Sequence, residues 1–316
     1  MKEKRPFKHL IFIPTLFFSV AFLFFACTTR GAIRAEEYFS IGMAFYELGN
    51  FVEAERWLNR ARAADRTMVA SEYNLGRIAF ETGRFEEAAG YFERILRRDP
   101  ENVMALRGAA YSRIHNGDME IAEQHYERVL SLIPESADDG FNHALVLFSM
   151  EKYEESGNVL NRYQHSFDEN PAIVLLLARN QKAQDKVEAV DSYARWLELT
   201  DEISSIGLFE YAHVLENAGF YARSLEVFNE SLNTHVLDSE RLSRATIRFN
   251  IARLYMIADP DNPGALSELE AAVLDGFSDT ASLELLQRDE RITSAHRDEI
   301  RRLLTQLTAE SEQEDT

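Results

Sequence analysis

Small and apolar residues recur along this chain with a fixed period of 34 residues, within sequence that is typical of helices. The positions that keep this step are Gly42/Gly76, Gly49/Gly83/Gly117, Phe51/Phe85, Ala54/Ala88/Ala122 and Asp65/Asp99. Such a period predicts a unit of two helices that is repeated and stacked on its neighbours. It therefore predicts an all-α solenoid and argues against most enzyme folds.

Two kinds of glycine in this pattern have a geometric reason. Gly42 and Gly76 fall where the first helix of a unit crosses the second, and only a small side chain permits this close approach. Gly49, Gly83 and Gly117 directly follow the first helix. A left-handed residue commonly ends a helix there, and glycine adopts that conformation at little cost. We therefore expect left-handed turns at these three positions.

Later units depart from the pattern. Glu151 replaces the turn glycine in the fourth unit. In the fifth unit, eleven residues separate Ala178 from Ala189 instead of twelve. We expect the turn inside the fifth unit to be shortened.

The unit over residues 69–102 is the most regular, with Tyr73-Asn74-Leu75-Gly76 followed by Ala88, Phe92 and Asp99-Pro100. This pattern resembles the tetratricopeptide repeat. The resemblance implies an all-α, right-handed solenoid of about seven helix-turn-helix repeats, with a C-terminal helical cap at 276–308 and an acidic, disordered tail at 309–316. The seven repeats are expected at 35–68, 69–102, 103–136, 137–170, 171–204, 205–243 and 244–275.

The first 26 residues have the order of a secretory signal peptide. A basic segment at 2–8 precedes an apolar run at 10–26, which ends at Cys27, the single cysteine of the chain. This placement resembles a bacterial lipobox, which implies that Cys27 is acylated and becomes the N-terminus of a membrane lipoprotein. The tether at 27–34 is short, so the array is expected close to its membrane.

Two alternatives exist for this N-terminal segment. The apolar run at 10–26 is long enough to serve as an uncleaved anchor helix, or it could direct plain secretion. All three interpretations place the solenoid outside the cytoplasm. With one cysteine, no disulfide can form within the chain, so the fold must depend on packing.

The formal net charge of the chain is −19, and it becomes −22 without residues 1–26, which carry four basic residues and one acidic residue. A surface of this sign repels nucleic acid, so we expect no nucleic-acid partner. It also repels anionic lipid headgroups, so the acyl anchor, rather than the surface of the folded domain, would attach the protein to the membrane. The charge chiefly keeps a long helical array soluble.

No catalytic constellation is present: the chain has no phosphate-binding loop, no HExxH motif and no clustered histidines. The segment at 259–264, with Glu270, imitates the acidic spacing of a calcium-binding EF-hand loop. Pro263, however, stands where that loop needs an oxygen ligand, and the segment coincides with the turn inside the seventh repeat. We expect no metal, no cofactor and no enzymatic activity.

In tetratricopeptide proteins, fixed positions of the first helix of each repeat line a concave groove that takes extended peptides or partner helices. At these positions this chain carries aromatic residues and arginines, the usual anchors of binding hot spots. The residues expected to contact a partner are Phe39, Tyr46, Tyr73, Arg77, Phe80, Arg107, Tyr111, Phe141, Phe148 and Arg179. The same aromatic residues could instead pack one repeat on the next.

The groove positions of the sixth and seventh repeats hold His213, Glu216, Phe249 and Arg253, but we expect the site in repeats 2 to 4. A partner segment with carboxylates or a free C-terminus would suit the arginines. The expected function is a membrane-anchored scaffold for protein–protein interaction in the cell envelope, with a membrane-proximal envelope protein as partner. A surface-exposed adhesin and a solute-transport accessory protein are the alternatives.

Overall fold

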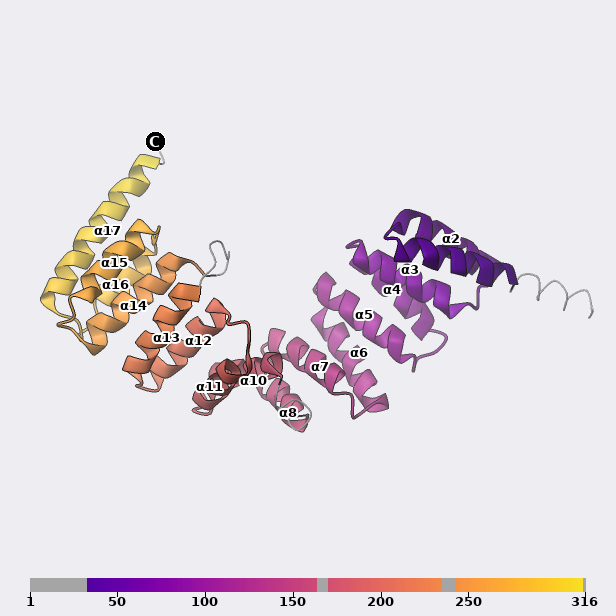
Figure 1. The fold of residues 1–316 in the computed structure, drawn as a ribbon, viewed down its shortest axis with the longest axis horizontal. Helices are drawn as coiled ribbons and strands as arrows, with labels where there is room; N and C mark the ends of the chain where they lie inside the picture. The colour runs from indigo at the N-terminus through magenta and orange to yellow at the C-terminus, as the bar shows by residue number, and fades with distance from the viewer. Residues whose placement is uncertain (1–32, 164–169, 235–241, 315–316) are drawn as a thin grey trace, which may run out of the picture. The chain divides into compact units, whose positions relative to one another are not determined.

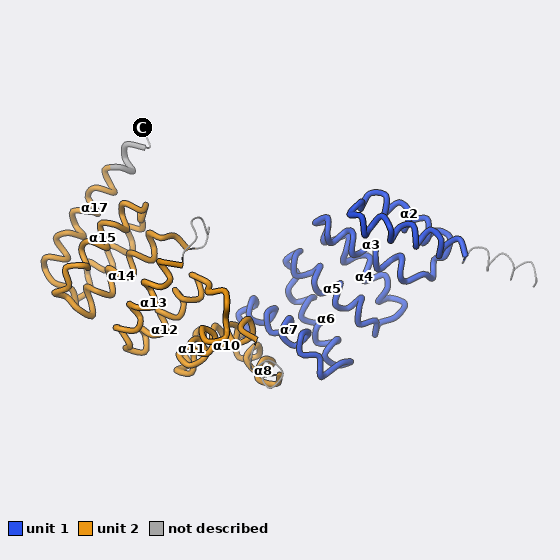
Figure 2. Tube along the Cα trace, in the orientation of Figure 1, with its two compact units in different colours: residues 1–152 blue, residues 153–316 orange. Residues whose placement is uncertain are grey.

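The computed structural model describes residues 33–163, 170–234 and 242–314. Every regular element in these ranges is an α-helix, and the helices follow one another as antiparallel pairs (Figure 1). The predicted all-α solenoid of helical hairpins is therefore confirmed. The chain forms two compact units, residues 1–152 and 153–316 (Figure 2).

In the first unit, each of the first three expected repeats contains two helices, and the fourth contributes its first helix. A helix over 33–47 begins the unit. It is followed by α2 (Phe51–Ala64), α3 (Val69–Glu81), α4 (Phe85–Leu96), α5 (Val103–Asn116), α6 (Met119–Leu132) and α7 (Ala137–Ser149).

The second unit continues the helical pairs and ends in two further helices. Its elements are α8 (Tyr153–Arg162), α10 (Pro171–Ala183), α11 (Ala189–Leu199), α12 (Ser205–Asn217), α13 (Tyr221–Thr234), α14 (Arg244–Ala258), α15 (Gly264–Leu274), α16 (Thr280–Gln287) and α17 (Ser294–Glu314).

Left-handed residues end the first helix of several pairs. Gly49, Gly83 and Gly117 have φ values of 70°, 75° and 86°, which confirms the expectation for these positions. Glu151 keeps the same conformation with a φ of 60°, although it has a side chain. The geometry of the turn is thus fixed by the pair of helices, and it imposes strain where glycine is missing.

The turn of the fifth repeat is longer than predicted. Five residues, 184–188, separate α10 from α11, whereas three, 82–84, separate α3 from α4. Asp185 is left-handed with a φ of 52°, and the Val190 N–H then bonds the Val187 carbonyl three residues back. This additional tight turn delays the start of the helix, so the buried Ala189 is the first residue of α11.

The core of the first unit depends on close contact between helix backbones and aromatic rings. A Cβ atom added to Gly76 on α3 would lie 2.8 Å from Cζ of Phe92 on α4. A Cβ added to Gly108 on α5 would lie 2.7 Å from Cε1 of the same ring. Phe92 therefore packs against two glycines of two successive repeats, and larger residues at these positions would displace it.

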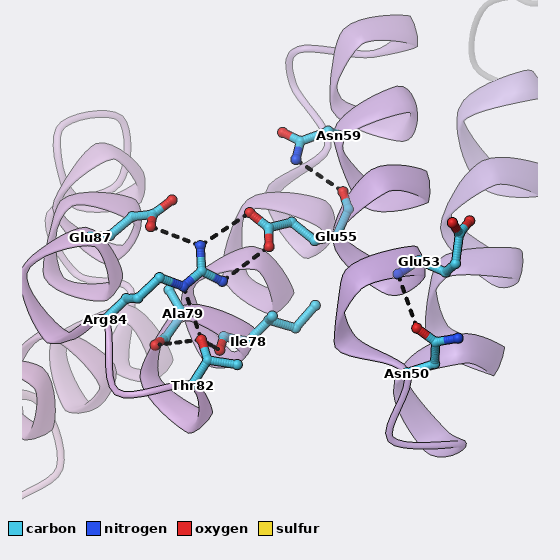
Figure 3. A network of polar contacts seen from close by, with 9 residues as sticks. All are labelled: Asn50, Glu53, Glu55, Asn59, Ile78, Ala79, Thr82, Arg84 and Glu87. Carbon is cyan, nitrogen blue, oxygen red and sulfur yellow. Dashed lines mark hydrogen bonds and ion pairs between the residues drawn. The ribbon is translucent and has the colours of Figure 1, made fainter.

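Polar side chains join the first two repeats at their surface (Figure 3). The Arg84 guanidinium, at the start of α4, donates to both carboxylate oxygens of Glu55 on α2 at 3.3 and 3.0 Å. It also donates to Glu87 at 2.9 Å and to the Thr82 hydroxyl at 3.0 Å. One arginine thus connects α2, the α3–α4 turn and α4.

The last two helices close the array. Leu283 and Leu286 of α16, and Ile300 and Leu303 of α17, are buried in one cluster with Phe249 of α14. α17 continues to Glu314, so the described chain is helical over 309–314, where the sequence predicted a disordered tail. Glutamate, glutamine and alanine are good helix formers, and they allow a helix already anchored by its apolar side to continue.

The expected signal peptide, Cys27 and most of the tether lie outside the described residues. Within the described ranges, every helix is too short or too polar to cross a membrane.

The turn positions give a paired stability prediction. Gly117→Ala should lower the free energy of unfolding by about 1 kcal/mol, since a Cβ there meets no atom within 4 Å but the backbone is left-handed. Glu151→Gly should raise it by up to about 1 kcal/mol, because it removes the same strain. Urea denaturation of both variants measures these changes. A loss of stability in Glu151→Gly would contradict this account of the turn.

Candidate protein-binding faces

The first candidate face lies on the first helices of the repeats in the first unit. Tyr46 and Arg77, both predicted to contact a partner, meet there. The Arg77 guanidinium lies 4.7 Å from the centre of the Tyr46 ring and donates to its hydroxyl at 2.6 Å. The Tyr46 hydroxyl in turn donates to Glu81. Burial and this hydrogen bond raise the pKa of Tyr46 to about 12, so the phenol stays protonated.

An aromatic cluster lies further along the same face. Phe80 on α3 contacts the ring of Tyr111 on α5 at a centroid distance of 5.8 Å and the ring of Phe85 at 5.3 Å. His115 on α5 stacks on Phe85 at 4.7 Å. We call Phe80, Phe85, Tyr111 and His115 the aromatic cluster. The predicted residues Phe80 and Tyr111 are thus brought together by two successive repeats.

A pocket of about 170 Å³ opens beside this cluster, between α5 and α7. Tyr111, Ile114 and His115 line one side, and Leu145 and Val146 line the other. Tyr111 is 47% exposed and Leu145 is 38% exposed, so both side chains can be reached from solvent. The pocket is therefore an accessible apolar site, which we call the α5–α7 pocket.

The other predicted residues of this face are more engaged in the fold. Phe39 and Tyr73 pack against the core of the first unit, and Phe141 and Phe148 are half-buried on α7. Phe39 and Tyr73 thus have the packing role that the sequence left open as an alternative.

Arg107 forms an ion pair that joins two repeats. Its guanidinium donates to both carboxylate oxygens of Asp139 at 2.9 and 2.6 Å, and Asp139 is almost fully buried. The Ser136 hydroxyl donates to the same carboxylate at 2.5 Å. Hydrogen bonding to Asp139 raises the pKa of Arg107, despite the opposing effect of burial. Much of the hydrogen-bonding capacity of Arg107 is therefore used within the fold.

The second unit has a larger cleft, of about 710 Å³, lined by residues of α12, α14 and α16. Phe249 and Phe277 stack in its wall at a centroid distance of 4.3 Å. Asn217 and Asn250 add polar atoms. Arg179, the one predicted contact residue of this unit, is not part of the lining and pairs with Glu210 at 2.8 Å. We call this site the α12–α16 cleft.

A half-buried ion pair forms part of the α12–α16 cleft. The Arg253 guanidinium on α14 donates to both oxygens of Glu216 on α12 at 2.7 and 2.5 Å. His213 Nδ1 lies 3.5 Å from the same carboxylate. Burial alone would raise the pKa of Glu216, but the hydrogen bonds from His213 and Arg253 lower it to about 2. The carboxylate is thus charged at neutral pH and compensated by its neighbours.

The sequence placed the main site in repeats 2 to 4 and left the α12–α16 cleft out. Four lining residues of this cleft occupy groove positions of the sixth and seventh repeats: His213, Glu216, Phe249 and Arg253. The repeat period was the sequence signal that could have pointed to the cleft. The contributions of Phe277 and Asp289 come from the cap, beyond the last repeat, where no periodicity points to them.

One group among the described residues has donor atoms close enough for a metal ion: Glu123 and Glu127 of α6 with His143 of α7, within 4.8 Å of one another. The Lys152 ammonium donates to both oxygens of Glu123 at 2.8 Å. It therefore competes with a cation for that carboxylate. The EF-hand-like segment forms the α14–α15 turn, where the Gly264 N–H bonds Asn262 at 2.8 Å.

Comparison with known proteins shows what part of the chain and its fold are similar to. A family model described as tetratricopeptide repeat matches residues 73–138, which include most of the second and third repeats. No curated protein matches the chain. Residues 73–138 are therefore similar to tetratricopeptide repeats, and the described chain has the helical-repeat fold of tetratricopeptide structures. Repeats of this type generally mediate protein–protein interaction.

Solved structures show the same fold. A tetratricopeptide repeat protein from Parabacteroides merdae is 18% identical, with a TM-score of 0.57, and the match covers 80% of this chain and 98% of that one. A MamA structure from Desulfovibrio magneticus is also 18% identical, with a TM-score of 0.50, and the match covers 52% of this chain and 94% of that one. Likeness at this identity shows the architecture alone.

The Glu216 ion pair makes stability dependent on pH. Because its folded pKa of about 2 lies below the ordinary value of 4.5, Glu216 stabilises the fold above about pH 4.5, and this contribution is lost as the pH falls toward 2. Glu216→Gln should cost about 2–3 kcal/mol at pH 7 and progressively less below pH 4.5. Urea denaturation at pH 7 and pH 4 measures this difference. The control Glu226→Gln, in an exposed pair with Arg223, should change little.

Proposed function

We propose that this protein is a membrane-anchored scaffold that binds a segment of an envelope protein on the first-helix face of its repeats. The observation that carries the proposal is the α5–α7 pocket beside the aromatic cluster. In this pocket, exposed apolar side chains lie beside aromatic rings that two successive repeats pack together. Exposed apolar sites of this kind mark interaction surfaces.

The size of the pocket suits one side chain of a partner. Its volume of about 170 Å³ is close to the roughly 150 Å³ of an apolar cavity that holds a benzene ring. Tyr111 and His115 would contact an aromatic or aliphatic anchor from one side, and Leu145 from the other. Such a buried anchor, surrounded by weaker contacts, is the usual form of a binding hot spot.

The neighbouring polar groups suit the main chain or a carboxylate of the partner. Arg77 remains 40% exposed while it contacts Tyr46, so it offers donors at the edge of the same face. Asn142 and Ser149 line the α5–α7 pocket and supply further hydrogen-bonding groups. An extended peptide or a helix with one apolar anchor fits this combination better than a wholly apolar partner.

The pocket can be tested through Tyr111 and Leu145, which are exposed and belong to none of the hydrophobic core clusters of the described residues. Tyr111→Ala with Leu145→Glu should remove the principal partner in crosslinking of intact cells followed by mass spectrometry, or weaken its binding at least about 100-fold. Arg107 is unsuitable for this test because its loss leaves buried Asp139 unpaired.

A matched control is available on α6, where Ile121 is also 39% exposed but does not line the pocket. Ile121→Glu should retain the partner. An unchanged set of partners in the double variant would refute the pocket as the binding site. External protease reaches only proteins at the surface of intact cells. Partners that are lost only after such treatment would therefore favour the alternative of a surface-exposed adhesin.

Membrane attachment gives a separate prediction. The proposed acylation of Cys27 means that Cys27→Ser should move the protein from the detergent phase to the aqueous phase in Triton X-114 partitioning. Retention in the detergent phase would assign the anchor to the apolar run at 10–26 instead.

A further inference from the structure

Five arginines surround an open cavity of about 540 Å³ in the first two repeats, at the C-terminal ends of α2 and α4. This arginine cavity is lined by Arg62, Arg66, Arg94, Arg97, Arg98 and one carboxylate, Glu72. Most of these residues belong to the second helices of their repeats or to the connections that follow them, so the cavity is distinct from the α5–α7 pocket.

Part of the cavity wall is held rigidly. Glu72 is only 8% exposed, and it accepts hydrogen bonds from Arg94, at 2.8 Å, and from Arg98. Arg98 also donates to the main-chain carbonyl of Arg66 at 2.9 Å. The Arg94 guanidinium lies over the Tyr91 ring at 4.2 Å. These contacts fix two guanidinium groups before any ligand arrives, which reduces the entropic cost of binding.

Arg62 is also held in place by neighbouring side chains. Its guanidinium donates to Asn59 Oδ1 at 3.0 Å and lies 5.7 Å from the centre of the Tyr91 ring. Asn59 itself is oriented by its bond to the Glu55 carbonyl at 2.9 Å, drawn in Figure 3. Arg62 thus faces the cavity without a carboxylate partner.

The charge of the cavity is unbalanced. Among the described residues, Arg62, Arg66 and Arg97 form no ion pair, so five guanidinium groups are opposed by Glu72 alone. This occurs in a chain with 53 acidic and 34 basic residues. Arg62 and Arg94, in last helical turns, do complement helix dipoles. The interaction with the helix dipoles does not explain why Arg66 and Arg97, which follow the helices, line the same cavity.

We propose that the arginine cavity binds a phosphate group. Guanidinium groups form paired, charge-assisted hydrogen bonds with phosphate oxygens, and several of them around one centre suit a tetrahedral anion. The cavity also has room for the molecule that carries the phosphate. A phospholipid headgroup and a soluble phosphate compound share this chemistry, and the experiment below separates them. The proposal does not depend on the proposed protein-binding function.

The test uses the full chain in non-ionic detergent at fixed ionic strength. Inorganic phosphate is titrated by calorimetry, and phosphatidylglycerol is added to the micelles with phosphatidylcholine as the zwitterionic control. Arg66→Ala with Arg97→Ala removes two exposed guanidinium groups that have no ion pair and leaves the Arg66 carbonyl for Arg98. The Kd should rise at least about tenfold for each guanidinium lost.

The control Arg195→Ala with Arg223→Ala makes the same charge change in the second unit, where both arginines form exposed pairs with neighbouring glutamates. It should leave the Kd within about twofold. Saturable binding of phosphate that is lost only in the cavity variant supports a soluble ligand, and the same result with phosphatidylglycerol supports a lipid headgroup. Binding of neither probe, or equal loss in both variants, would overturn the proposal.

Discussion

The ring of Phe92 lies between two glycines on different helices, and this contact joins the two helices of one repeat to the next repeat. Without a Cβ on Gly76 or Gly108, α3 and α5 can both approach the same ring. In the second unit, Trp196 of α11 similarly packs on Gly207 of α12, where an added Cβ would lie 2.4 Å from the indole. A single hairpin cannot bury such a ring by itself, so each repeat depends on its neighbour.

Several arginines of this acidic protein join one repeat to another. Arg84 reaches Glu55, Arg107 reaches Asp139, and Arg253 reaches Glu216. These partners are 29, 32 and 37 residues apart, close to the repeat length. Exposed pairs of this kind add little stability individually, but the more buried ones fix how one hairpin sits on the next. The arginine cavity is different because most of its guanidinium groups have no carboxylate partner.

The faces of the molecule therefore separate by chemistry. The first-helix face of the first unit is aromatic and apolar, the α12–α16 cleft mixes aromatic rings with a compensated ion pair, and the arginine cavity is cationic. A helical-repeat protein can carry several such sites because each pair of neighbouring repeats forms its own local surface. The sites then differ through side chains at a few positions, while the framework stays the same.

The sequence by itself determined the helical pairs, the left-handed glycines and the close helix crossings. These follow from local backbone preferences and from a period that repeats along the chain. It also located Phe80 and Tyr111 at groove positions. It did not distinguish groove aromatics that remain accessible from those that pack in the core.

The tertiary structure decided which side chains remain available to a partner. Arg107 is paired with a buried carboxylate of the following repeat, and the α12–α16 cleft includes residues of the cap. Arg66 and Arg97 line one cavity although they are 31 residues apart in the sequence. The longer α10–α11 turn likewise reflects where Ala189 is buried. The period fixes where a residue stands in its repeat, but its partner depends on how neighbouring repeats pack, and no single repeat contains that information.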